Sequence, residues 1–257
     1  MLKLDQITVQ YGALMALNAV SLVIAEGTIS VIEGHHGAGK SSLLKAIIGA
    51  VPSKGKVWLD QRLITRRTPV RLLQAGVVLV PEGRQLFGRL STRENLQFGL
   101  HVAGGRGSIE TALEYFPQLS PLLDKPAYVL SGGQAQMLAI ARAMLAKPCY
   151  LLADEPLMGL SDGPREQVWQ VLVDLRSRGV GVLVTGEHLV STGTVIEQHK
   201  IINNGNFARG IIMKNTITYA LALACAIPTG IAQANMAKTH TSCMPHKQAL
   251  TYACKVH

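Results

Sequence analysis

The segment from Gly34 to Ser41, Gly-His-His-Gly-Ala-Gly-Lys-Ser, constrains the fold more than any other part of the chain. The apolar run from Ile29 to Glu33 precedes it, and the apolar helical pattern from Ser42 to Ile48 follows it. The order is therefore strand, glycine-rich loop, helix, which is the setting in which this spacing binds phosphate. Backbone N–H groups of the loop and of the helix N-terminus point at the same anion.

The side chains of this loop add to the phosphate-binding prediction. Lys40 offers a mobile positive charge, and the Ser41 hydroxyl offers a ligand to Mg²⁺. The adjacent histidines His35 and His36 could suggest a metal, but we expect no metal site there. The candidate nucleotide-binding residues in this segment are Gly34, His35, His36, Gly37, Ala38, Gly39, Lys40, Ser41 and Ser42.

The pattern of the other apolar segments predicts an α/β fold. Leu2 to Gln10 and Val20 to Val31 alternate apolar and polar residues, the second with a break at Glu26-Gly27, and both are expected as strands of an opening sheet. Further expected strands are 55–60, 77–80, 149–153 and 180–185, and further expected helices are 92–100, 132–146 and 166–178. Continuous apolar strands alternating with helices indicate a parallel core.

An acidic pair, Asp154-Glu155, ends the apolar run that starts at Cys149. Ligands of open α/β sheets gather at the carboxyl ends of the strands. Asp154 is a candidate Mg²⁺ ligand, directly or through water, and Glu155 a candidate base that orients or deprotonates the attacking water.

A second glycine motif, Leu130-Ser131-Gly132-Gly133-Gln134, lies between the phosphate loop and the acidic pair. The loop already supplies what one triphosphate needs from its own chain, so a second such motif implies a second chain. The phosphate loop, this motif, the acidic pair and His188 occur in the order found in ATP-binding subunits of ABC transporters. Residues 1 to about 210 resemble that family.

The resemblance implies an α/β fold: a P-loop NTPase core of ABC type, with an N-terminal antiparallel β-subdomain and an inserted α-helical subdomain at about 85–146. It implies one ATP-binding domain at 1–212, which hydrolyses ATP with Mg²⁺. Tyr11 resembles the aromatic residue that stacks on adenine, and His188 the histidine that contacts the γ-phosphate and positions the water. Leu130, Ser131, Gly132, Gly133 and Gln134 resemble the signature that faces the nucleotide of the partner subunit.

Two positions depart from the common family pattern. Glu82 stands where most members have a glutamine that contacts Mg²⁺, and Ser161 stands where an aspartate is common. Glu82 remains a candidate Mg²⁺ ligand. The run Pro81-Glu82-Gly83-Arg84, together with Met158-Gly159-Leu160, resembles the LivF-type branch of branched-chain amino-acid importers. Urea and short-amide importers are the nearest alternative.

The expected partners follow from the same resemblance. They are a second ATP-binding subunit, expected to be distinct so that a heterodimer forms, with a homodimer as the alternative, and integral membrane permease subunits. A periplasmic binding protein is an indirect partner. We expect the chain at the cytoplasmic face of the plasma membrane, with no spanning helix of its own. The rival classes are a soluble ABC ATPase outside transport and a nucleotide-binding subunit with impaired hydrolysis.

The charge distribution argues against a nucleic-acid partner. The formal net charge is +9, but no acidic residue follows Glu197, whereas Lys200, Arg209, Lys214, Lys238, Lys247 and Lys255 are all basic. The segment after Glu197 therefore carries +6 of this charge, which leaves residues 1–197 at +3 and close to balanced.

The tail, 213–257, changes character at Met213. A short basic start, the apolar stretch Ile217 to Ile227 and the sequence Ala232-Gln233-Ala234 have the three-part pattern of a secretory signal peptide. We interpret it as lying outside the fold, through a frameshift, a lost stop codon or fusion, with a membrane-surface or partner-binding helix as the alternative. Cys243, His246, Cys254 and His257 form two Cys/His pairs that suit Zn²⁺ only if the tail folds.

Overall fold

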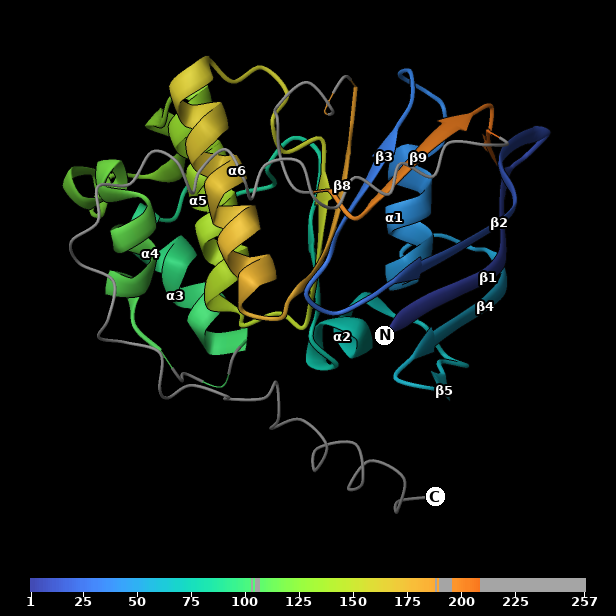
Figure 1. Cartoon of the computed structure of the whole chain (residues 1–257). Helices are drawn as coiled ribbons and strands as arrows, with labels where there is room; N and C mark the ends of the chain where they lie inside the picture. The colour runs from blue at the N-terminus through green and yellow to red at the C-terminus, as the bar shows by residue number, and fades with distance from the viewer. Residues whose placement is uncertain (103, 105–106, 188, 190–195, 209–257) are drawn as a thin grey trace, which may run out of the picture. The chain divides into compact units, whose positions relative to one another are not determined.

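Two sheets form the framework of the chain in the computed structural model, which describes residues 1–102, 104, 107–187, 189 and 196–208 (Figure 1). The first is antiparallel, with the strand order β2-β1-β4-β5. Its strands are β1 (Leu2–Tyr11), β2 (Leu14–Ile24), β4 (Lys54–Leu59) and β5 (Arg62–Leu63). Along β1, Leu2, Leu4, Ile7 and Val9 are buried, as expected for a sheet with one face on the core.

The second sheet has the order β10-β9-β3-β8-β7-β6, and its strands from β9 to β6 are parallel. They are β3 (Ile29–Glu33), β6 (Val77–Val80), β7 (Tyr150–Asp154), β8 (Gly181–Gly186), β9 (Gln198–Asn203) and the antiparallel edge strand β10 (Asn206–Phe207). All residues of β7 and β8 are buried, because helices or the other sheet cover both faces.

Helices connect the strands. They are α1 (Lys40–Ile48), α2 (Pro69–Gln74), α3 (Thr92–Val102), α4 (Ile109–Tyr115), α5 (Gly132–Leu145) and α6 (Asp162–Ser177), with short 3₁₀ turns η1 (Pro117–Leu122) and η2 (Ala127–Val129). Among the described residues, no helix is both long enough and apolar enough to cross a membrane.

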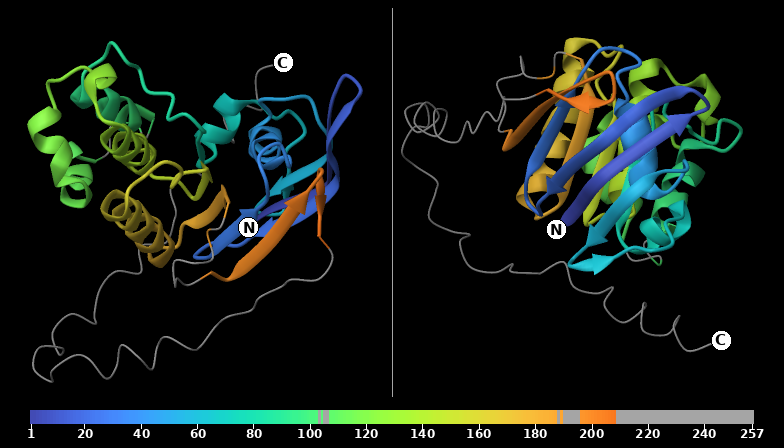
Figure 2. Two further views of the ribbon diagram at one scale, coloured as in Figure 1. Left: turned by 90° about the horizontal axis from the view of Figure 1, so that it is seen from above. Right: turned by 90° about the vertical axis from the view of Figure 1, so that its right-hand side faces the viewer.

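The parallel sheet separates two hydrophobic clusters. On one face, Ile32, Leu152 and Leu183 pack with α1 and with the antiparallel sheet. The left view in Figure 2 places that sheet on the α1 side of the parallel sheet, away from α5 and α6. The alternation of side chains along each strand puts residues of both clusters on the same strand.

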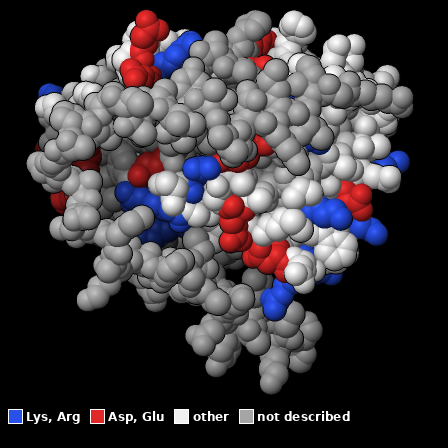
Figure 3. Space-filling view, in the orientation of Figure 1, with Lys and Arg blue, Asp and Glu red and all other residues white. Residues whose placement is uncertain are grey.

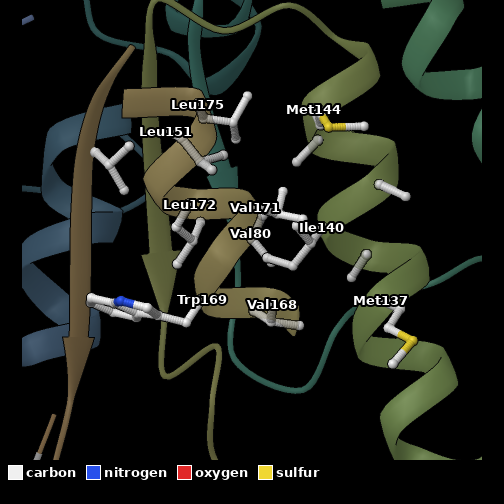
Figure 4. Packing of buried hydrophobic residues seen from close by; sticks show 14 of the residues in the cluster. Val80, Met137, Ile140, Met144, Leu151, Val168, Trp169, Val171, Leu172 and Leu175 are labelled. Atoms are coloured by element: carbon white, nitrogen blue, oxygen red, sulfur yellow. The ribbon is translucent and has the colours of Figure 1, made fainter. Parts of the chain in front are cut away.

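On the other face of the parallel sheet, α5 and α6 pack against each other and against the strands. Figure 4 shows Met137, Ile140 and Met144 of α5 near Val168 and Val171 of α6, and Val80 and Leu151 belong to the same cluster. The helix that begins at the second glycine motif is therefore fixed to the core along its length.

Several predicted boundaries require correction. Ile29–Glu33 does not belong to the opening antiparallel sheet; it pairs with β8 and β9, while β2 begins earlier than predicted, at Leu14. Helix α6 begins at Asp162 rather than Glu166, because Ser161 has extended backbone angles at the N-cap and Pro164 suits a first turn. The elements not predicted are β5, α2, α4, η1, η2, β9 and β10.

Within the predicted helical insertion of 85–146 lie α3, α4, η1, η2 and α5, which we propose as a helical subdomain. His188 and the whole tail from Met213, including its Cys/His pairs, fall outside the described residues. Their assignments stay predictions.

Candidate nucleotide-binding site

The glycine-rich loop leaves the carboxyl end of β3 and enters α1, as predicted. Gly37 and Gly39 have left-handed φ angles of 79° and 106°. A Cβ on Gly39 would lie 2.5 Å from the carbonyl oxygen of Ala16, so glycine is required there. A hydrogen bond of 3.3 Å from Gly34 N–H to Gly186 O fixes the start of the loop to the end of β8.

Lys40 extends back beneath the loop and is only 3% exposed. Its Nζ donates to the carbonyl oxygens of Gly34, at 2.6 Å, and His35, at 3.0 Å. It also lies 3.0 Å from Oε1 of Glu155. The loop lysine and the predicted base are therefore brought together in one buried ion pair.

The acidic pair begins at Asp154, the last residue of β7, and contacts β8. The Asp154 carboxylate is buried, and its Oδ1 accepts a hydrogen bond of 2.7 Å from the Thr185 hydroxyl. The Glu155 N–H donates to Thr185 O at 3.1 Å, and Glu155 has a left-handed φ of 48°. This strained conformation turns the Glu155 side chain back toward the loop. Thr185 was not singled out from the sequence, because one threonine in an apolar strand carries no distinctive signal.

The remaining predicted residues near the loop occupy its surface. Tyr11 is the last residue of β1 rather than the first after it, is 43% exposed, and its hydroxyl lies 3.5 Å from Ser42 Oγ. Its side chain is therefore partly exposed beside the loop helix. His35 and His36 are exposed. No cluster of three or more His, Cys, Asp or Glu side chains able to hold a metal occurs among the described residues.

The donor set nevertheless suits Mg²⁺ in a phosphate site, where one or two carboxylates and the phosphates suffice. Ser41 lies in the first turn of α1, and Asp154 ends a buried strand. Glu82 is exposed in the turn after β6, at the same edge of the sheet. The chemistry of these oxygens therefore fits the predicted metal.

The second glycine motif forms the start of α5. Ser131 is the N-cap: its hydroxyl accepts from Gln134 N–H at 3.3 Å, while the Gln134 side chain accepts from Ser131 N–H at 3.0 Å. Gly133 faces Pro164 of α6, and a cavity of about 410 Å³ lies here, lined among others by Ser131, Gly133, Gln134 and Gln167. Leu130 and Gly132 flank the N-cap.

The motif does not meet the phosphate loop within one chain. Among the described residues, the structure gives no hydrogen bond or ion pair between 130–134 and 34–42. The phosphate loop lies at the end of β3, and the second glycine motif lies at the start of α5.

Arg84 and Arg142 connect the Glu82 turn to α5 by hydrogen bonds. Neither contact could be predicted from the sequence. Arg84 Nε donates to Gln136 Oε1 at 3.3 Å, and its guanidinium lies against Gly132. Arg142 Nη2 donates to Gln85 O at 3.0 Å, and burial lowers the pKa of Arg142. These contacts connect the turn to the helix that begins with the second motif.

Comparisons with known proteins show which family and which individual proteins the chain is similar to. A family model described as "ABC transporter" matches residues 17–158. The chain is 31% identical over 84% of its length to the high-affinity branched-chain amino acid transport ATP-binding protein BraG of Pseudomonas aeruginosa, covering 93% of that protein. It is 29% identical over 85% of its length to the xylose import ATP-binding protein XylG of Pseudomonas syringae pv. syringae, but spans 45% of that protein.

A solved structure has the same architecture. It is the dimeric post-hydrolysis state of the ATP-binding cassette MJ0796 bound to ADP and Pi, with 26% identity and a TM-score of 0.71. The match covers 84% of this chain and all of that one, at 100%.

Proposed function

Because the chain belongs to the ABC transporter family and is one of its ATP-binding, ATP-hydrolysing subunits, we propose that it powers an importer of branched-chain amino acids. The observation that carries the proposal is its likeness to BraG over 93% of that protein's length. The similarity to XylG makes a sugar importer the second candidate function. The chain spans only 45% of the length of XylG, so this similarity supports the second candidate less than the similarity to BraG supports the first.

The geometry supports separate roles for Lys40 and Glu155 in hydrolysis. Phosphate bound by the loop amides would receive a hydrogen bond from Lys40, which would then share its ammonium with Glu155. Glu155, freed in part from that ion pair, would accept the proton of the attacking water. Tyr11 offers an exposed ring to adenine. His188 keeps its sequence-based role at the γ-phosphate.

Mg²⁺ would be held by Ser41 and Asp154, with Glu82 as a further carboxylate. When bound, it neutralises the charge that develops on the transferred phosphoryl group. The chain's own contribution is orientation, because Thr185 fixes one carboxylate oxygen of Asp154 by its hydrogen bond.

The separation of the two glycine motifs supports action across a dimer. Ser131 and Gly133 would approach the nucleotide held by the partner subunit, since no described contact joins them to the loop of their own chain. The MJ0796 cassette is dimeric in its ADP-bound structure. We propose a heterodimer with a related ATP-binding subunit, and a homodimer is the alternative outcome.

A surface near the Glu82 turn suits the membrane partner. Exposed apolar side chains lie on two neighbouring segments joined by hydrogen bonds from Ala127 N–H to Leu90 O at 2.9 Å and from Tyr128 N–H to Gly88 O at 3.1 Å. The exposed members on these segments are Phe87, Leu90, Tyr128 and Val129, and the exposed Phe98 of α3 contacts Phe87, with ring centroids 4.9 Å apart. Such a patch marks an interaction surface, and we propose that it contacts a permease at the cytoplasmic face of the membrane.

The described side chains on the face drawn in Figure 3 do not favour nucleic acid. In Figure 3, basic and acidic side chains are interspersed on the face shown. A nucleic-acid backbone calls for a continuous basic strip.

Transport by the assembled complex tests the proposal. The chain, its membrane subunits and the binding protein would be reconstituted in vesicles, and radiolabelled leucine and xylose would be supplied in parallel with ATP. We expect ATP-dependent uptake of leucine, and none when Glu155 is replaced by glutamine. Uptake of xylose instead would reject the amino-acid assignment while leaving the ATPase assignment intact.

A further inference from the structure

Glu33 occupies an unusual place for a carboxylate. It is the last residue of the central strand β3 and directly precedes Gly34, the first residue of the phosphate loop. Its side chain is 16% exposed. A carboxylate so far removed from water requires hydrogen-bond partners.

Those partners are a residue of the neighbouring strand β9 and a residue that follows the other neighbouring strand, β8. Oε2 of Glu33 accepts from Nε2 of His199, on β9, at 2.9 Å. Oε1 accepts from the backbone N–H of Leu189, in the segment that follows β8. One carboxylate therefore connects the start of the phosphate loop, β9 and the segment after β8.

The His199 contact is directional. The ring is buried, and Nδ1 has no hydrogen-bond partner among the described residues. A carboxylate can only accept, so Nε2 must carry the donated proton. Among the described residues, the hydrogen bond to Glu33 is the one that orients the His199 ring, and it holds one oxygen of the Glu33 carboxylate.

Leu189 is itself closely packed. Its side chain is buried, and a Cβ on Gly186 would lie 2.9 Å from Leu189 Cδ1, so β8 needs a glycine at its end for this packing. In the chain, Leu189 directly follows His188. Glu33 thus holds the backbone next to a predicted γ-phosphate residue.

We propose that Glu33 is a positioning residue for ATP hydrolysis: its carboxylate, held by His199, fixes the Leu189 backbone relative to the phosphate loop. The proposal rests on the proposed hydrolytic function. It assigns Glu33 no contact with nucleotide, and it predicts an effect on turnover rather than on nucleotide affinity.

The test compares three variants of the full-length chain. Glu33→Leu removes the hydrogen bonds to Leu189 N–H and to His199 and should lower kcat about 10- to 100-fold, the size of effect expected from a misplaced reacting group, with KM and Kd for ATP changed less than about threefold. Glu33→Gln keeps an oxygen that accepts from Leu189 N–H and should retain most of the turnover. His199→Leu should give an intermediate loss, and combining it with Glu33→Leu should add little, since both act on one contact chain.

Glu197→Leu is the matched control. Glu197 also accepts from a backbone N–H, that of Ile29 at 2.7 Å, and pairs with Arg176, but it does so at the end of β3 remote from the loop. It should lower thermal stability while leaving kcat unchanged. If Glu33→Leu behaves like this control, or if Glu33→Gln loses as much turnover as Glu33→Leu, the proposal is overturned.

Hydrogen exchange gives a readout independent of turnover. In Glu33→Leu, the amide of Leu189 should exchange at least about tenfold faster, whereas it should keep its wild-type rate in Glu197→Leu. Unchanged exchange at Leu189 would overturn the proposal. Lack of ATP hydrolysis by the wild-type chain would reject the proposed function, whereas wild-type turnover in Glu33→Leu would reject the positioning role alone.

Discussion

The ammonium nitrogen of Lys40 lies 3.0 Å from a carboxylate oxygen of Glu155, and the two side chains are only 3% and 9% exposed. This ion pair joins the phosphate loop after β3 to the acidic pair at the end of β7. Any phosphate that takes a hydrogen bond from Lys40 must share it with the carboxylate proposed as the base. The side chain expected to bind phosphate and the side chain proposed to activate water are therefore in direct contact.

Glu155→Gln should separate binding from hydrolysis. The amide can still accept from Lys40 but cannot take a proton from water, so turnover should fall by about 1,000-fold, within the range for a lost general base. Nucleotide affinity, followed with a fluorescent ATP analogue, should be unchanged or higher. Glu166→Gln, at an exposed position of α6, is the control and should hydrolyse ATP normally. Unchanged hydrolysis in Glu155→Gln would remove Glu155 from its assigned role.

Lys40→Met should destabilise the protein even without nucleotide. It leaves the Glu155 carboxylate buried and unpaired, which typically costs about 3 kcal/mol of unfolding free energy. The double variant Lys40→Met/Glu155→Gln should recover at least half of that loss, because no isolated charge remains. Urea unfolding of the three variants measures the coupling, and additive losses would contradict it.

Much of this site could be predicted, because its chemistry is local in sequence. The loop, Asp154-Glu155 and the motif at Ser131 are short runs whose spacing and flanking elements carry the signal. The Lys40–Glu155 and Glu33–His199 pairs could not be predicted. The residues of each pair are far apart in the sequence, and only the order of the strands in the parallel sheet brings them together. Strand β9 was missed because Gln198, His199 and Lys200 break the apolar pattern. Helix α2 was missed although Thr68-Pro69 is a recognisable start.

Thr185→Val should weaken the acidic pair selectively. It removes the hydroxyl that donates to Asp154 at 2.7 Å but keeps the shape of the side chain. The loss of this buried hydrogen bond should cost about 1–3 kcal/mol of unfolding free energy. The concentration of Mg²⁺ that gives half-maximal hydrolysis should rise. Thr185→Ser retains the hydroxyl and should behave as wild type; equal effects of valine and serine would point to packing instead.

The two loop glycines should tolerate alanine differently. Nothing lies within 4 Å of a Cβ on Gly37, so Gly37→Ala should cost only the left-handed backbone penalty of about 1–2 kcal/mol. In Gly39→Ala the added carbon would also meet Ala16 O at 2.5 Å, and the chain should lose more stability and its nucleotide binding. Thermal unfolding and analogue binding compare the two, and equal behaviour would contradict the geometry.

Ser131 has two roles that substitution can separate. As the N-cap of α5 it stabilises the helix, and Ser131→Ala should cost about 1 kcal/mol. As part of the proposed surface for the partner's nucleotide, it must also accommodate phosphate. Ser131→Asp keeps a capping oxygen, and a carboxylate at a helix N-terminus is favourable, so unfolding free energy should be preserved.

The same carboxylate would face the negative charge of the partner subunit's triphosphate. Hydrolysis by the assembled dimer should therefore fall at least about 100-fold in Ser131→Asp, while the chain's own loop binds nucleotide normally. Ser131→Ala, the less stable variant, should lose less activity than the more stable Ser131→Asp. This inverted order distinguishes a role toward the partner from simple helix capping. If activity follows stability across the two variants, the cap alone explains the serine, and the proposed dimer arrangement loses its support at this position.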